Sequence, residues 1–171
     1  MTWEELYLDF SDKVHHYILL MVGNEVLAED LTHDVFIKVQ RALGDFRGDS
    51  SYYSWIITIA RNVVYDHWRR KKIVQFISFT SDREVDANTP EIILEKNEEI
   101  LELYKIIKKL KVQYQEVIIL RKIQELSISA TAEALGCSTS RVKTITFRAM
   151  NALRAELRKN LHGGEDIGPQ L

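Results

Sequence analysis

Apolar residues recur at intervals of three and four positions along most of the chain, and this period constrains the fold more than any other feature. Between residues 2 and 22 the repeat consists of Leu6, Phe10, Val14, Tyr17, Ile18 and Met21. Side chains at this spacing line one face of an α-helix. Residues that end helices are scarce, since the 171 residues include only 2 Pro and 7 Gly, and three of the glycines lie in the last nine positions. We therefore predict an all-α fold.

The same pattern predicts where each helix begins and ends. Helices are expected over residues 2–22, 25–43, 52–72, 90–110, 113–123, 127–135 and 139–159. Ser50 or Ser51 is suited to cap the third helix, and Thr89 the fourth. The repeat is lost over residues 73–90, which have a polar, linker-like composition. We predict two small helical modules, 1–73 and 98–162, joined by a flexible linker, 74–97, and followed by a disordered tail, 163–171.

Charge is distributed in blocks, although the formal net charge is only -2. Residues 1–34 and 82–102 are acidic, whereas residues 61–72 and 141–159 are basic. Phosphate attraction depends on local potential rather than on net charge, so the two basic blocks predict binding to nucleic acid. The alternative is that each block is an ordinary solvated helix face.

The C-terminal third has the pattern of a helix-turn-helix. A short helix over 127–135 is followed by Gly136-Cys137-Ser138 and by a longer helix whose first half is basic and polar. Gly136 stands where the backbone leaves the first helix, a position that often requires positive φ. Cys137 is expected to be a small turn or core residue, with a redox switch as the alternative.

Several classes of function lack candidate residues. Cys137 is the only cysteine, and the histidines (His15, His16, His33, His67 and His162) show no spacing typical of metal ligands. Neither a nucleophile–base pair nor a phosphate-binding glycine loop is present, so we expect no enzyme activity, no cofactor and no metal. No signal peptide or apolar run of about 20 residues is found, and we expect a cytoplasmic protein.

A set of short segments, taken in order, resembles the bacterial RNA polymerase sigma factors of the extracytoplasmic-function (ECF) group of the sigma-70 family, especially those of Bacillus-like bacteria. In the first module the segments are Ala28–Phe36, Phe46–Ser51, Trp55, Ile59–Asn62 and Asp66–Arg70. In the second module they are Tyr114–Arg121, Ala132–Gly136, Val142–Thr144, Phe147–Ala149 and Ala152–Arg154.

This resemblance implies a fold and a function. The first module would be the helical bundle called sigma region 2, which binds the β′ clamp helices of core RNA polymerase and opens the −10 promoter element. The second would be sigma region 4, which reads the −35 element as duplex and contacts the β flap. Partners would be core RNA polymerase, promoter DNA and a membrane-associated anti-sigma factor that holds the chain inactive, with no membrane insertion of the chain itself.

The resemblance also assigns site residues. The expected −10 DNA-binding residues are Phe46, Arg47, Asp49, Ser51, Tyr52, Tyr53, Arg61, Asn62, Tyr65, Arg69 and Arg70. The expected −35 DNA-binding residues are Ser138, Thr139, Arg141, Lys143, Thr144, Phe147 and Arg148. The expected core polymerase-binding residues are Asp30, His33, Asp34, Lys38 and Arg41. Rings and polar groups in the first set suit flipped bases, and the basic residues suit phosphates and guanine edges.

Some of these residues have structural alternatives. Trp55 is expected in the core rather than on DNA, and Phe147 either contacts a thymine methyl or packs inside its module. Two positions depart from the family pattern: Ile145 replaces a common arginine, and Thr131 occupies a usually apolar position. Both concern the detailed −35 preference.

Two other functions remain open from the sequence. One is a self-sufficient transcription regulator whose N-terminal helices dimerise or sense a ligand. The other is an interaction protein that mimics a sigma factor and binds an anti-sigma factor. The aromatic loop beside a basic helix favours the sigma factor, because neither alternative requires a module that opens DNA strands.

Overall fold

All regular structure in the described residues is helical, as predicted. The computed structural model describes residues 1–77 and 98–162. Its elements are α1 (Trp3–Val22), α2 (Glu25–Ala42), a 3-10 turn (Leu43–Asp45), α3 (Tyr52–Ile77), α4 (Glu98–Lys109), α5 (Val112–Ile118), a π-helical segment (Ile119–Ile123), α6 (Ile128–Leu135) and α7 (Thr139–His162). The tail, most of the expected linker and the expected Thr89 cap lie outside the described residues.

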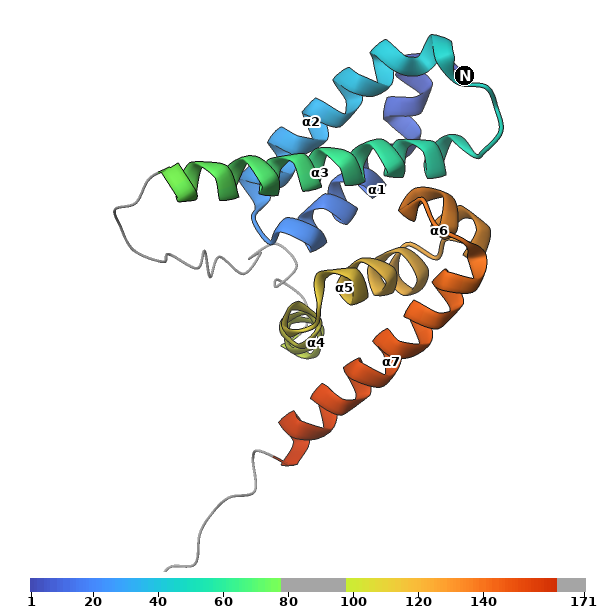
Figure 1. Ribbon diagram of the computed structural model, residues 1–171. Coiled ribbons are helices and arrows are strands. Elements are labelled where there is room, and N and C mark those ends of the chain that lie inside the picture. Colours follow the sequence, from blue (N-terminus) through green and yellow to red (C-terminus); the bar gives the residue numbers. More distant parts are fainter. Residues whose placement is uncertain (78–97, 163–171) are drawn as a thin grey trace, which may run out of the picture.

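The first module is a bundle of α1, α2 and α3 (Figure 1). Thr2 starts α1 with a capping box, in which its hydroxyl accepts from the backbone N–H of Glu5 and the Glu5 carboxylate accepts from the N–H of Thr2. Gly23 ends α1 at φ 73°, and Asn24 caps α2 at once. The two helices are therefore forced into a tight hairpin that brings their apolar stripes together.

The second module consists of α4 to α7. Its own core contains Ile106, Val117, Val142 and Ala149, all nearly or fully buried. Ser127 caps α6 through a hydrogen bond from the N–H of Ala130, and Gly136 ends that helix at φ 62°. Thr131, which occupies a usually apolar position of the family, is fully buried. Its hydroxyl donates to the carbonyl of Ser127, so the buried hydroxyl has a hydrogen-bond partner.

The two modules share a hydrophobic core. Ile119, Leu120, Leu126 and Ala134 of the second module belong to the same buried cluster as α1, α2 and α3. Figure 1 shows α5 and α6 beneath α3, with the C-terminal end of α7 pointing away from the first module. The two modules of the described chain therefore pack directly against each other.

Two helices differ from their predicted bounds. α3 continues beyond the expected end at Lys72 to Ile77, because residues 73–77 contain neither Gly nor Pro and can extend the helix. The helix expected over 113–123 widens into a π-helical segment after Ile118. That segment ends where the N–H of Gln124 donates to the carbonyl of Ile119, and Glu125 then adopts φ 56°.

Candidate nucleic-acid interface

The start of α7 presents every expected −35 residue to solvent. Ser138 caps the helix by accepting from the N–H of Arg141 at 3.2 Å. The stripe of Val142 and Ala149 faces the core of the module and is fully buried. All seven expected residues, Ser138, Thr139, Arg141, Lys143, Thr144, Phe147 and Arg148, are exposed. A helix that is fixed along one side thus offers its basic, hydroxyl-rich side to a partner.

Phe147 does not pack inside the module. Its side chain is 67% exposed. It lies at the rim of an open hollow of about 260 Å³, together with Arg121, Ile128 and Lys143. An exposed ring beside a lysine suits an apolar contact with a base edge or with a partner protein.

The loop expected to meet the −10 element is held together by stacked rings. The ring of Phe46 lies 4.4 Å from that of Tyr52 and 5.0 Å from that of Trp55, measured between centroids. Trp55 packs against the main core, in agreement with its expected structural role. Ser51 caps α3 by accepting from the N–H of Ser54, while the side chains of Arg47 and Asp49 are exposed. The loop therefore has an ordered aromatic base and a polar rim.

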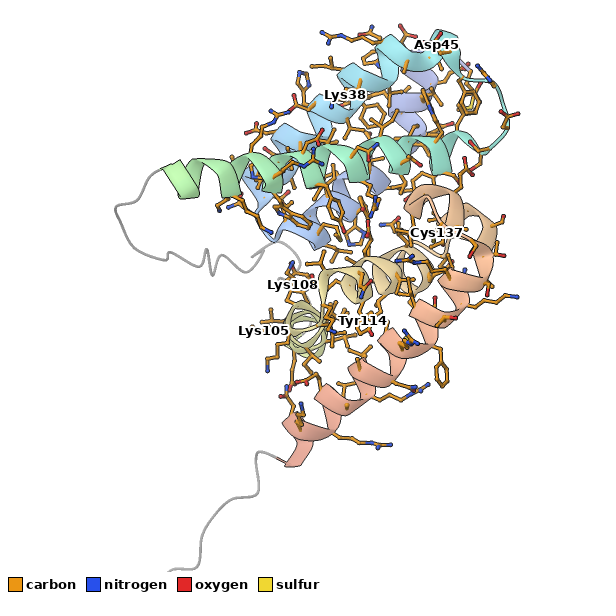
Figure 2. All side chains as sticks on the ribbon, viewed as in Figure 1. Lys38, Asp45, Lys105, Lys108, Tyr114 and Cys137 are labelled. Carbon is orange, nitrogen blue, oxygen red and sulfur yellow. The ribbon has the colours of Figure 1, made fainter. Side chains whose placement is uncertain are left out.

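The expected polymerase-binding residues form one exposed face of α2. Asp30, His33, Asp34, Lys38 and Arg41 are all exposed, whereas the opposite stripe of this helix is buried. Figure 2 places Lys38 on α2, across α3 from the second module. This face is thus accessible in the closed chain.

Part of the expected −10 surface is covered by the second module. Asn62, Arg69 and Arg70 are exposed, and Arg69 pairs with Asp66 at 3.3 Å. Arg61 and Tyr65, in contrast, both contact Glu116 of α5. The expected −10 residues of α3 therefore form two groups: Asn62, Arg69 and Arg70 are open to solvent, whereas Arg61 and Tyr65 are covered by α5.

Glu116 is the centre of the covered part. Its side chain is only 2% exposed. One carboxylate oxygen accepts from Nε of Arg61 at 2.7 Å and from the hydroxyl of Tyr17 at 3.2 Å, and the other accepts from the hydroxyl of Tyr65 at 3.0 Å. The guanidinium of Arg61 also lies 4.5 Å from the ring centroid of Tyr65. A buried carboxylate is satisfied in this way by donors that all come from the other module.

The electrostatics keep these donors protonated. Burial and the charge of Glu116 raise the pKa of Tyr65 to about 12 and that of Tyr17 well above its usual value. Burial by itself would lower the pKa of Arg61, but the adjacent Glu116 carboxylate outweighs it and raises that pKa. Arg61 is therefore charged and both tyrosines are hydrogen-bond donors at neutral pH.

A second polar contact covers Tyr53. Its hydroxyl donates to the side-chain oxygen of Gln124 at 2.7 Å, directly after the π-helical segment. Its ring stacks on Phe10 at 5.5 Å. Sequence reasoning missed Glu116, Gln124 and Tyr17 as parts of this surface. The available signal was a charged residue, Glu116, directly before the apolar Val117 and Ile118, which required a partner elsewhere in the chain.

Other kinds of site are not found in the described part of the chain. No cluster of His, Cys, Asp and Glu within residues 1–77 and 98–162 could hold a metal ion. None of the described helices is long and apolar enough to cross a membrane. Cys137 is half-buried, and it packs beside the second core.

Comparison with known proteins gives consistent matches over both modules. Residues 6–73 match the family Sigma-70 region 2, and residues 100–153 match Sigma-70, region 4. The chain is 35% identical over 161 residues to RNA polymerase sigma factor YlaC of Bacillus subtilis, covering 92% of this chain and 91% of that protein. It is 31% identical to ECF RNA polymerase sigma factor SigX of the same organism, covering 91% and 84%.

Solved structures share the fold. Sigma factor RpoE, in complex with the anti-sigma factor NepR from Bartonella quintana, superposes with a TM-score of 0.74 at 21% identity, covering 91% of this chain and 96% of that one. CnrH, in complex with the cytosolic domain of CnrY, superposes with a TM-score of 0.70 at 23% identity, covering 91% and 87%.

Proposed function

The chain belongs to the ECF group of RNA polymerase sigma factors, which direct promoter-specific transcription initiation, and from this premise we propose how its surfaces divide that work. The exposed face of α2 binds the β′ clamp helices of core polymerase. The aromatic loop and α3 bind the opened −10 element, and the start of α7 reads the −35 duplex. The observation that carries this division is the exposure of the α2 face and of the basic turns of α7 on separate parts of the molecule.

The proposed −35 contact follows from the geometry of α7. Lys143 and Arg148 are exposed donors suited to guanine edges, and Ser138, Thr139 and Thr144 are suited to phosphates. Ile145 is half-buried beside the core of the module. The arginine contact that is common at this position is therefore replaced by packing, and Arg141, Lys143 and Arg148 carry the positive charge on the exposed side of the helix.

The proposed −10 contact combines stacking with backbone binding. Phe46, Tyr52 and Tyr53 supply rings for unstacked bases, and Arg47, Asp49, Ser51 and Asn62 supply polar groups. Arg61, Tyr65, Arg69 and Arg70 follow the phosphates of the non-template strand. The second module must leave Arg61 and Tyr65 before these contacts form, because Glu116 occupies them in the closed chain.

Regulation by an anti-sigma factor forms part of the proposal. Its support is that the RpoE structure of the same fold was solved with an anti-sigma factor. We propose that such a partner, membrane-associated, holds this chain inactive in the cytoplasm, where the chain acts without catalysis of its own. The two alternative functions, a self-sufficient regulator and a sigma mimic, are less well supported, because relatives that match 92% and 91% of the chain are named sigma factors.

Reconstitution tests the proposed function. Purified chain is mixed with core RNA polymerase and a library of promoter fragments, and open complexes are detected by permanganate reactivity of unpaired thymines. We expect a stable holoenzyme and opening of a subset of fragments. Absence of a complex with core polymerase, or opening that is the same without the chain, contradicts the proposal.

A further inference from the structure

The covered part of the −10 surface binds an internal acidic group. Arg61 and Tyr65 lie on α3, Tyr17 on α1, and Glu116 reaches all of them from α5. Glu116 lies 55 positions after Arg61 and 99 after Tyr17, so the contact joins segments remote in sequence. An acid placed so deeply against the first module needs a reason, because burial of an ionised carboxylate is costly without good partners.

The donors that hold Glu116 are the kind that hold a phosphate. An arginine and two tyrosine hydroxyls offer N–H and O–H groups to an anionic oxygen, and a phosphodiester presents oxygens of the same acceptor type. Each tyrosine hydroxyl has one proton, which Glu116 already accepts. Tyr65 therefore cannot donate to Glu116 and to a DNA phosphate at once.

A further polar contact, between α4 and α1, secures the other end of the interface. Lys108 of α4 donates to the carbonyl of Met21 at 2.8 Å, and the hydroxyl of Tyr104 donates to the carbonyl of Leu20 at 3.3 Å. Both acceptors lie in the last turn of α1, where unpaired carbonyls favour a positive charge. Figure 2 labels Lys108 on α4, with Lys105 on the same helix. Glu116, Gln124 and α4 thus attach the second module at three separate points.

We propose that the second module is an intramolecular competitor for the −10 surface, and that Glu116 is the residue that occupies the phosphate-binding donors of Arg61 and Tyr65. This proposal rests on the proposed function only in assigning that surface to single-stranded DNA. In the closed chain, Gln124 accepts from the hydroxyl of Tyr53, and Glu116 accepts from Nε of Arg61 and from the hydroxyl of Tyr65; in the open chain all three donors are free. Free chain is consequently a weak binder of single strands until a partner separates the modules.

The contact is specific and can still be reversed. When the modules separate, Glu116 and Arg61 return to water, and their regained hydration offsets much of the lost attraction. An open hollow of about 220 Å³ beside the pair, lined by Arg61, Arg141 and Glu116, gives water a route to the contact. Apparent DNA affinity is then reduced by the fraction of chains that are open at any moment.

The experiment uses the full-length free chain and two matched pairs of variants. Glu116→Gln removes the buried carboxylate, and Glu102→Gln makes the same charge change at an exposed position of α4. Lys108→Met removes one of the two hydrogen bonds from α4 to the end of α1, and Lys105→Met is its exposed control on the same helix. Binding of a short fluorescein-labelled oligo(dT) is measured by anisotropy at fixed ionic strength, and the radius of gyration by small-angle X-ray scattering.

The expected result is that Glu116→Gln binds the oligonucleotide about tenfold more tightly than wild type, which corresponds to a wild-type chain that is open about a tenth of the time. Lys108→Met shifts in the same direction, both variants have a larger radius of gyration, and both controls match wild type. Circular dichroism verifies that each variant is folded, and Lys108→Met decides the question if Glu116→Gln unfolds.

Unchanged affinity and unchanged size in both test variants overturn the proposal. This outcome is distinguishable from failure of the proposed function, because anisotropy and scattering are measured on the free chain without polymerase. If wild-type chain opens promoters with core polymerase while Glu116→Gln behaves as its control, the proposed function stands and the proposed competition by the second module is wrong. If the chain forms no complex with core polymerase, the proposed function is wrong. The anisotropy and scattering measurements still test whether the second module competes for the −10 surface.

Discussion

The Nε atom of Arg61 lies 2.7 Å from a carboxylate oxygen of Glu116, and this pair joins the two modules. The carboxylate also accepts from Tyr17 and Tyr65, so one acid organises donors from two helices of the first module. Because removal of one member of a buried pair leaves the other without a partner, the contact is sensitive to the protonation state of each donor.

Alkaline pH should weaken the closed chain. The folded pKa of Tyr65 and that of Tyr104 are each raised to about 12 from an ordinary value of 10.0, with burial as the main cause. A raised pKa means that the folded state holds its proton more tightly than the unfolded state, so this stability is complete below pH 10 and is lost as pH rises to 12. Urea unfolding, followed at a series of pH values, should show a flat midpoint up to about pH 10 and a decline above it.

Tyr65→Phe and Tyr104→Phe serve as controls for the assignment of this decline. Each variant should lose part of the pH dependence while remaining folded at neutral pH, since only the hydroxyl is removed. A decline of the same size in the double variant would assign the effect to other groups.

Lys143→Ala or Arg148→Ala should weaken binding to the −35 duplex by about 1–3 kcal/mol, because each removes an exposed donor from the start of α7. Binding to core polymerase should change little. Anisotropy with a labelled promoter duplex measures the first effect, and co-elution with core polymerase measures the second. Arg158→Ala removes the same charge from the rear of α7 and is the control. Equal losses in all variants would indicate general charge attraction rather than a defined contact.

Helical periodicity was sufficient to predict the helices and their order, because each apolar stripe records which face is buried. Gly136 predicts a turn, and its φ is positive, as is that of Gly23 at the end of α1. The end of α3 was placed too early, since nothing in residues 73–77 stops a helix and only the loss of period suggested an end there.

The interface between the modules could not be predicted in the same way. Glu116 was visible only as a charged residue beside Val117 and Ile118, and sequence alone does not reveal which distant donors satisfy it. The resemblance assigns the partners Arg61 and Tyr65 to DNA, and it gives no information on contacts between the two modules. Long-range polar contacts depend on the tertiary arrangement, which has no local signature.

Asp34→Ala or Arg41→Ala should weaken core polymerase binding by up to about 1 kcal/mol each, the usual scale for an exposed charge contact, and leave −35 duplex binding unchanged. Both residues lie on the exposed face of α2. Glu29→Ala is the control, because it removes a charge from the same helix at the edge of that face, beside His33 and about a third of a turn from the centre of the face. Polymerase affinity is compared by competition with a labelled wild-type chain. Equal losses at Glu29 and Asp34 would mean that the face is assigned wrongly.

Gly136→Ala should destabilise the second module by about 1–2 kcal/mol, because the backbone at this position has a left-handed conformation that a Cβ atom disfavours. No neighbouring atom lies within 4 Å of the added Cβ, so the cost comes from the backbone alone. Gly44→Ala is the matched control: it also has open space, but its φ is not positive, and alanine there should be neutral or slightly stabilising. Thermal unfolding of both variants measures the difference. If Gly136→Ala melts like Gly44→Ala, the turn before α7 tolerates a side chain, and the position of α7 does not depend on this glycine.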